Sequence, residues 1–178
     1  DITAKFENPN KDRLAPAFVK EIADVVNAQA GDTLPVSVFN EYVDGTIPAG
    51  TSAYEKRGVA VKVPEWQADN CIQCNNCAFV CPHAAIRPFL LTDEEAAAAP
   101  EGVKLQQGKA VFKEYKFGIS VSVLDCTGCG NCADVCPSKE KALVMKPLQS
   151  QEAEQKNFDY LHAHIGYKDN VQPKTGNI

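Results

Sequence analysis

All eight cysteines of this 178-residue chain fall into two short groups with the same internal spacing. The groups are Cys71-x2-Cys74-x2-Cys77-x3-Cys81 and Cys126-x2-Cys129-x2-Cys132-x3-Cys136, and a proline follows each, Pro82 and Pro137. This spacing is typical of bacterial iron–sulfur ligation, in which the fourth cysteine of each run binds the other of two clusters. Three thiolates separated by two residues allow one loop to hold three corners of a cubane, while the fourth points toward the neighbouring cubane.

The spacing therefore predicts two [4Fe-4S] clusters with crossed ligand sets. The first set is Cys71, Cys74, Cys77 and Cys136, and the second is Cys126, Cys129, Cys132 and Cys81. Because each cluster would connect both cysteine groups, we expect cluster loss to unfold the domain. Gly128 and Gly130 lie between ligands of the second group, where the absence of a side chain permits a close approach of backbone to cluster.

Other uses of these cysteines fit the spacing less well. Structural zinc sites use two separated Cys-x2-Cys pairs rather than triplets followed by x3-Cys-Pro. Disulfides need an oxidising compartment, and closely spaced triplets pair poorly. His83 follows the first group and could tune a cluster, although a surface histidine is the simpler interpretation, as it is for His162 and His164. We interpret Trp66 and Phe79 as core residues rather than electron relays.

The elements around the two groups repeat, because the second group begins 55 residues after the first. In each copy a strand precedes the cysteines, and a Cys-Pro pair and a second strand follow them. This predicts an α+β, ferredoxin-like domain with pseudo-twofold symmetry over residues 59–148, interrupted by an insertion at residues 92–116. The expected strands are 59–63, ended by Pro64; 85–91, placed at an edge by Pro88; 117–123; and 142–145.

The flanking segments predict less regular structure. An amphipathic pattern indicates a helix over residues 15–30, capped by Asp12 and ended by Gly31. Residues 34–42 could form a strand, and the turn-rich residues 44–57 predict a loop. Thr92 and Glu95 form a capping-box pattern that opens a short helix. We expect residues 1–58 to form a helix-and-linker segment and the polar residues 149–178 to form a linker toward a missing catalytic domain.

Composition excludes several classes of partner. The chain has 18 Lys plus Arg against 23 Asp plus Glu, a net charge of −5, so neither nucleic acid nor an anionic membrane is an expected partner. No apolar stretch approaches the roughly 18 residues of a spanning helix, and the first twenty residues are too charged for a signal peptide. We therefore expect a cytoplasmic protein. A single methionine, Met145, and a start at Asp1 predict a processed chain or a section of a longer one.

Around the cysteines, several further segments match one family. They are Glu55-Lys56-Arg57-Gly58, Val63-Pro64-Glu65-Trp66, Cys81-Pro82-His83-Ala84-Ala85-Ile86-Arg87-Pro88 and Leu124-Asp125-Cys126-Thr127-Gly128-Cys129-Gly130-Asn131-Cys132-Ala133-Asp134-Val135-Cys136-Pro137. From about residue 30 to 165 the chain resembles the pyruvate:ferredoxin (flavodoxin) oxidoreductase family, also called pyruvate synthases. The matching part is the linker and the ferredoxin-like two-cluster domain of these anaerobic enzymes.

The resemblance implies an electron-transfer segment. It would carry electrons from thiamine-diphosphate-dependent oxidative decarboxylation of pyruvate, which yields acetyl-CoA, to an external ferredoxin or flavodoxin. Thiamine diphosphate, coenzyme A and a third cluster are expected only in the rest of the enzyme, because this chain has no thiamine motif and no ninth cysteine. The segment alone therefore has no catalytic residue, and the full enzyme is expected to be a homodimer. The alternative is a ferredoxin-like carrier subunit of another 2-oxoacid oxidoreductase or of a hydrogenase.

Overall fold

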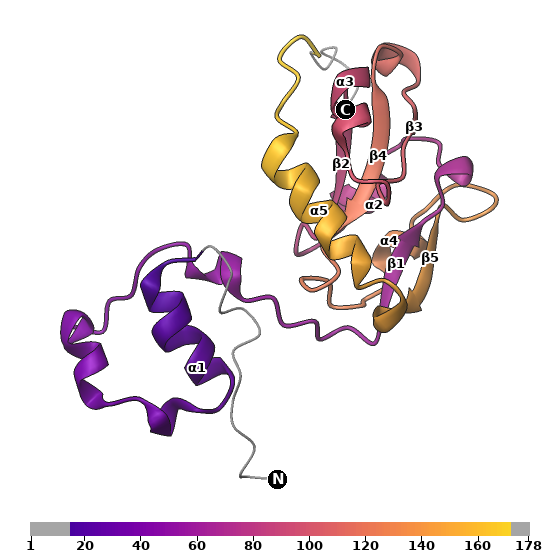
Figure 1. The fold of residues 1–178 in the computed structure, drawn as a ribbon. Coiled ribbons are helices and arrows are strands. Elements are labelled where there is room, and N and C mark those ends of the chain that lie inside the picture. The colour runs from indigo at the N-terminus through magenta and orange to yellow at the C-terminus, as the bar shows by residue number, and fades with distance from the viewer. Residues whose placement is uncertain (1–14, 172–178) are drawn as a thin grey trace. The chain divides into compact units, whose positions relative to one another are not determined.

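The computed structural model describes residues 15–171, which form two compact units that divide between Lys56 and Arg57. Sequence analysis placed this boundary two residues later, after Gly58. The figures colour the chain from indigo at its start to yellow at its end (Figure 1). Each unit is described by itself.

The first unit is helical. A π-helical turn, Val19–Ala23, runs directly into α1 (Asp24–Asn27), and Val19 and Ile22 are its buried residues. The helix stops before Gly31, because Gln29 already adopts a left-handed backbone with φ 60°. The predicted cap, Asp12, lies outside the described residues.

Two further predictions for this unit have different outcomes. The strand expected at residues 34–42 is wrong, since Val36–Tyr42 is a 3-10 helix. A strand needs a hydrogen-bonding neighbour, and none of the described residues of this unit forms one. The loop expected at residues 44–57 is confirmed: it contains one 3-10 turn, Thr51–Tyr54, and two glycines, Gly45 and Gly50, with positive φ.

The second unit is the expected α+β domain, and its strands pair as an internal repeat requires. One two-stranded antiparallel sheet joins β1 (Lys62–Trp66) to β5 (Leu143–Pro147). A second antiparallel sheet has the order β2-β4-β3, with bounds Ile86–Leu91, Lys116–Val121 and Gln106–Gln107. The strand that begins the first repeat, β1, thus pairs with the strand that ends the second, β5. The strand that ends the first repeat, β2, pairs with the strand that begins the second, β4 (Figure 1).

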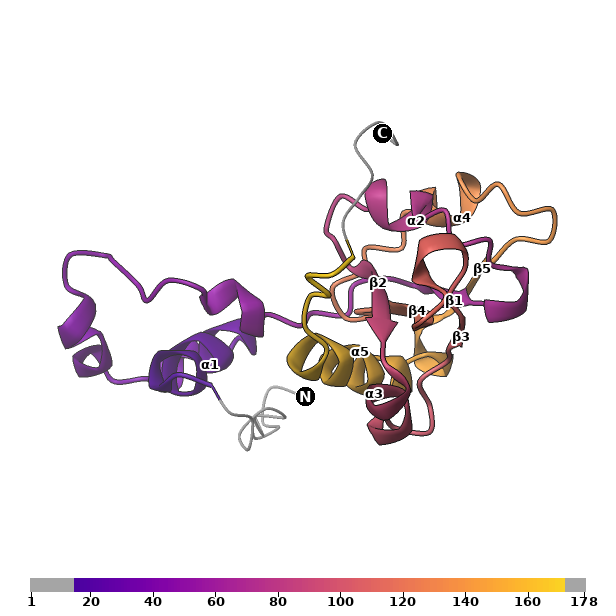
Figure 2. The ribbon, with the colours of Figure 1, turned by 90° about the horizontal axis from the view of Figure 1, so that it is seen from above.

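Four helices surround these strands. Two short helices, α2 (Asn76–Phe79) and α4 (Asn131–Asp134), each contain the third cysteine of a group, and α3 (Asp93–Ala98) opens the insertion. The last is α5 (Ala153–His164). Figure 2 shows α2 and α4 on one side of the strands and α5 on the other. No helix in residues 15–171 is long and apolar enough to cross a membrane.

The first predicted strand is displaced toward the C-terminus. Val59 and Val61 are 64% and 82% exposed, and Pro64, expected to end the strand, lies inside β1 opposite Met145. A proline is tolerated there because β1 has only one neighbouring strand and an edge position does not need every N–H. Pro88 likewise lies in β2, at the edge of the second sheet as predicted.

The C-terminal segment is not simply a linker. Helix α5 packs on β4, and Phe158 and Leu161 are buried with Phe89 and Leu91 in a second core. Residues 153–164 therefore belong to the domain, which corrects the expectation of a linker for this stretch. The apolar residues of α5 are few, so its sequence looks polar, yet the largest aliphatic and the phenylalanine, Leu161 and Phe158, are buried. This cover also explains why β4 has buried residues on both faces.

The insertion begins with the predicted capping box. The Glu95 N–H donates to Thr92 Oγ1, and the Glu95 carboxylate accepts from the Thr92 N–H. Helix α3 ends at Ala98, just before Pro100, as the sequence indicates. The insertion then returns to the sheet as β3.

Candidate iron–sulfur sites

The eight thiols are free and line two separate cavities, four thiols in each. One cavity, of about 330 Å³, is lined by Cys71, Cys74, Cys77 and Cys136 together with Trp66, Ile119 and Leu143. The other, of about 390 Å³, is lined by Cys126, Cys129, Cys132 and Cys81 together with Pro64, Ile86 and Met145. We call them the first and the second cavity. Each cavity thus receives three cysteines from one group and the fourth from the other.

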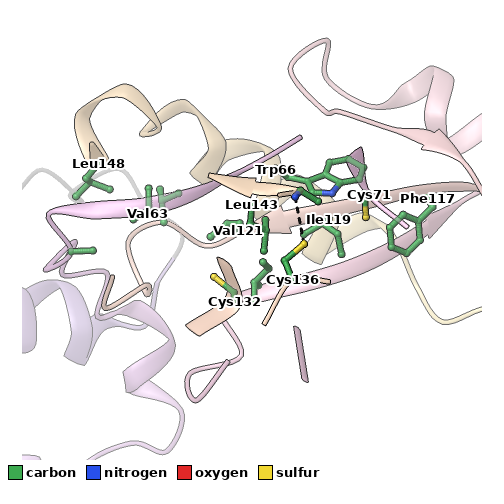
Figure 3. Close-up of a cluster of buried hydrophobic side chains, with 14 residues drawn as sticks. Val63, Trp66, Cys71, Phe117, Ile119, Val121, Cys132, Cys136, Leu143 and Leu148 are labelled. Atoms are coloured by element: carbon green, nitrogen blue, oxygen red, sulfur yellow. Dashed lines mark hydrogen bonds between the residues drawn. The ribbon is translucent and has the colours of Figure 1, made fainter. Parts of the chain in front are cut away.

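Three of the thiols lie in the larger hydrophobic core of the second unit, which we call the main core. Cys71, Cys132 and Cys136 are buried among residues such as Val63, Val121 and Leu143, as the close-up in Figure 3 shows. Cys74 and Cys129, the second cysteine of each group, are exposed. The two exposed positions correspond in the repeat, so each cavity opens to solvent at an equivalent corner.

The backbone of both cysteine loops is wound in the same unusual way. Gln73 and Asn75 in the first loop have φ of 63° and 61°, and Gly128 and Gly130 at the corresponding positions have 73° and 81°. This conformation turns backbone N–H groups toward sulfur: the N–H of Gln73 donates to Cys71 Sγ and that of Gly128 to Cys126 Sγ, both at 3.4 Å. Cys136 Sγ, which also lines the first cavity, accepts a similar hydrogen bond from the Ala142 N–H (Figure 3).

Sequence reasoning found only half of this feature. The glycines of the second loop were singled out for a close approach of backbone to cluster, not for their left-handed backbone. Gln73 and Asn75 gave no signal, although the 55-residue offset aligns them with Gly128 and Gly130. Glycine is required at Gly128 for a further reason. A Cβ there would lie 2.8 Å from the Lys62 carbonyl oxygen and 3.2 Å from Ala60 Cβ.

The local environment keeps several thiols protonated when nothing is bound. Burial raises the pKa of Cys77 to about 11 and that of Cys132 to about 12, and neighbouring cysteine charges raise both further. Burial also raises the pKa of Cys126, where the nearby Cys81 adds to the effect. At Cys136, burial is outweighed by hydrogen bonds from Ala142 and Ser138 and by the Lys141 charge, so its pKa is lowered. Thiolate ligation by a metal would therefore release protons and relieve this penalty.

The insertion, residues 92–116, holds the first cysteine loop through hydrogen bonds to Gln73, which we call the clamp. The Gln73 side chain donates to the Gln107 carbonyl at 2.8 Å and accepts from the Lys109 N–H at 2.8 Å. Gln106 Nε2 also donates to the Cys71 carbonyl, at 3.4 Å. Gly128, which replaces Gln73 in the second loop, has no side chain with which to make such bonds.

Comparison with known proteins gives the same division of the chain. Residues 67–139 match the family model of a 4Fe-4S dicluster domain, and residues 5–60 match a model of a domain of unknown function, EKR. The pyruvate-flavodoxin oxidoreductase of Enterobacter agglomerans is 57% identical over 156 residues, which cover 88% of this chain and 13% of that protein. The pyruvate:ferredoxin oxidoreductase of Moorella thermoacetica is 51% identical over 164 residues, or 90% of this chain and 14% of that protein.

A third relative, the pyruvate-flavodoxin oxidoreductase of Klebsiella pneumoniae, is 51% identical over 147 residues, 83% of this chain and 12% of that protein. Over most of its length the chain is similar to one segment of these oxidoreductases. It spans only about an eighth of the length of these relatives. The resemblance seen in the sequence is thereby confirmed, and so is the dicluster domain within it.

The residues of the two cavities fit a pair of iron–sulfur clusters. Each cavity offers four thiols in a mainly apolar lining, which is the donor set of a [4Fe-4S] cluster. The N–H groups directed at Cys71, Cys126 and Cys136 are the hydrogen bonds that such sulfurs accept. A tetrahedral zinc site would need the same four thiols but gives no reason for two equivalent loops.

Other residues singled out in the sequence have mixed outcomes. Trp66 is a core residue, 4% exposed, with its ring 6.2 Å from that of Phe117. Phe79 was expected in the core, which is wrong: it is 92% exposed, because α2 is a single turn that directs it away from the sheet. His83 is exposed at the rim of the second cavity. His162 is an exposed residue of α5 that stacks on Phe158.

Proposed function

We propose that this chain is the electron-transfer segment of a larger pyruvate:ferredoxin or pyruvate-flavodoxin oxidoreductase. The observation that carries the proposal is the pair of cavities, each with three thiols from one cysteine loop and one from the other. When bound, two [4Fe-4S] clusters would supply one-electron carriers at low potential, on the order of −400 mV for ferredoxin-type sites.

Within the proposal, the chain's own residues have distinct tasks. Cys71, Cys74, Cys77 and Cys136 would hold one cluster, and Cys126, Cys129, Cys132 and Cys81 the other. The apolar residues of the main core exclude water from the inner side of both sites. The exposed corners at Cys74 and Cys129 are where an electron could pass to or from another protein or another part of the enzyme.

The rest of the enzyme would contain the chemistry that this segment lacks. We propose that thiamine diphosphate, coenzyme A and a third cluster are bound there, and that oxidative decarboxylation of pyruvate supplies the electrons. External ferredoxin or flavodoxin would accept them, and the complete enzyme would be a cytoplasmic homodimer. The names of the relatives support pyruvate as substrate and flavodoxin or ferredoxin as acceptor. The other elements rest on the resemblance alone.

One experiment separates electron transfer from the earlier chemistry. In the full-length enzyme, Cys74→Ser should abolish pyruvate-dependent reduction of flavodoxin or ferredoxin. It should leave the exchange of CO2 into the carboxyl group of pyruvate, which needs no cluster in this segment. Ile72→Val, which changes a cavity residue but no thiol, is the matched control and should preserve both activities. Unimpaired acceptor reduction in Cys74→Ser would contradict the proposed route.

A further inference from the structure

Two lysine ammonium groups contact ligand residues of the first cavity. Lys109 Nζ donates to the Cys71 carbonyl oxygen at 3.1 Å, and Lys141 Nζ donates to the Cys136 carbonyl oxygen at 2.8 Å. Cys71 and Cys136 both line the first cavity, although they come from different cysteine groups. Neither ammonium group donates to a carbonyl of the four cysteines that line the second cavity.

The difference follows from places where the internal repeat is broken. Lys109 lies in the insertion, which occurs only once, and its backbone N–H is anchored by Gln73. Leu143 pairs with Trp66 as Ile86 pairs with the equivalent Val121, so the residue in the place of Lys141 in the first half is Ala84, which has no charge. Lys141 is held additionally by the Asp134 carbonyl at 3.1 Å, so its ammonium group is fixed over the C-terminal end of α4.

A fixed positive charge stabilises the more negative, reduced form of a nearby redox centre. Hydrogen bonding and net charge around the ligands are among the factors that set iron–sulfur potentials. Both ammonium groups reach the ligands on their carbonyl side, and both side chains remain partly solvent-exposed, so screening by water and salt limits the effect. The sign is nevertheless the same for the two lysines, and both act on one site.

We propose that Lys109 and Lys141 raise the reduction potential of the first site, formed by Cys71, Cys74, Cys77 and Cys136, above that of the second. This inference rests on the proposed function, since it requires both clusters. An electron delivered to the domain then resides mainly at the first site. Its exchange between the two sites transfers one electron, moves no proton and changes no bond. Lys109 and Lys141 are positioning and tuning residues, not ligands.

The test is a redox titration of the full-length enzyme followed by electron paramagnetic resonance. At a fixed ambient potential, Lys109→Gln and Lys141→Gln should each lower the reduced-to-oxidised ratio of one centre by threefold to tenfold. A tenfold change corresponds to 59 mV for one electron. The affected centre is identified as the first site if its signal is the one that Cys74→Ser alters.

Three comparisons make the result specific. Lys109→Arg keeps the charge and should restore most of the wild-type ratio. Lys104→Gln removes a lysine of the same insertion that pairs with Glu65 at 3.0 Å, and it should leave both centres unchanged. If Lys109→Gln fails to retain the first cluster, the Lys141→Gln titration alone decides the matter.

The outcomes also separate this inference from the proposed function. Wild-type enzyme in which this segment binds no iron and sulfide would overturn both. Two intact clusters whose ratios do not move in the glutamine variants, or move equally at both sites, would overturn the tuning role and leave the proposed function standing. A larger change at the site altered by Cys129→Ser would overturn it as well.

Discussion

The two cysteine loops reach the same backbone conformation by different means. In the second loop, glycine at positions 128 and 130 makes the left-handed conformation inexpensive. In the first loop, Gln73 and Asn75 occupy it at a cost of about 1–2 kcal/mol each, a cost that is lower for asparagine. Gln73 recovers part of this cost through its two hydrogen bonds to the insertion. One loop is therefore shaped by its own sequence and the other by a neighbouring segment.

The largest expected effect concerns the crossed fourth cysteines. Cys81→Ser should remove the cluster of the second site, and Cys136→Ser that of the first, because each side chain lines the cavity of the other group. Iron and sulfide analysis with electron paramagnetic resonance would measure which signal disappears. Since each cluster connects both halves, either variant should also lower the unfolding midpoint. Loss of the first-site signal in Cys81→Ser would refute the crossed arrangement.

The glycines of the second loop provide a matched pair. Gly128→Ala places a Cβ 2.8 Å from the Lys62 carbonyl oxygen, whereas at Gly130 no atom lies within 4 Å of an added Cβ. Both variants must hold alanine at positive φ, which costs about 1–2 kcal/mol. Only Gly128→Ala adds the steric cost of overpacking, for a total loss of roughly 2–4 kcal/mol. Denaturant unfolding of the cluster-loaded chain would measure both; equal losses would mean that the close approach to Lys62 is unimportant.

The clamp on the first loop is tested at Gln73. Gln73→Ala keeps the strained backbone but removes the two side-chain hydrogen bonds, which should destabilise this loop by about 1–2 kcal/mol. The first cluster should then be lost to a chelator faster than in wild type, while the second keeps its rate. Gln67→Ala is a control outside the clamp, because the Gln67 side chain donates to the Glu65 carboxylate. Equal acceleration at both sites would argue that the insertion supports the domain as a whole.

Sequence reasoning succeeded where chemistry is encoded in short spacing. The repeat, the edge position of Pro88 and the capping box at Thr92 all follow from local residue types. The grouping of four thiols around each cavity agrees with the predicted ligand sets, although ligation itself stays a prediction. The bounds of β1 were wrong because proline is excluded only where its missing N–H is needed, and a two-stranded sheet does not need it there.

What sequence reasoning missed depends on long-range packing. Helix α5 was hidden because only a few of its residues are apolar, and their burial depends on contact with Phe89 and Leu91 of β2. The left-handed Gln73 is stabilised by residues 34 and 36 positions away in sequence, which no local pattern reveals. The same holds for Lys109, whose ammonium group reaches Cys71 across 38 positions.

The smallest expected effect lies at the entrance to the insertion that makes the two loops different. Partial burial raises the pKa of Glu95, but Lys168 at 2.7 Å and the Thr92 N–H together lower it below its ordinary value of 4.5. A carboxylate with a depressed folded-state pKa stabilises the protein above the unfolded-state pKa, and this contribution is lost as pH falls through the folded value.

For such a partly exposed ion pair the contribution is about 1 kcal/mol or less. Glu95→Gln keeps an oxygen for the Thr92 N–H but loses the charge, so α3 should exchange its amide hydrogens faster than wild type at pH 6. The two proteins should converge as the pH falls below about 4.5. Glu94→Gln, in the same first turn of α3, is the matched control and should show no such convergence. Because the insertion holds the first loop through Gln73, the loosening should reach the first cysteine loop and leave the second one unchanged. A response of equal size in both loops would show that the insertion is not what distinguishes them.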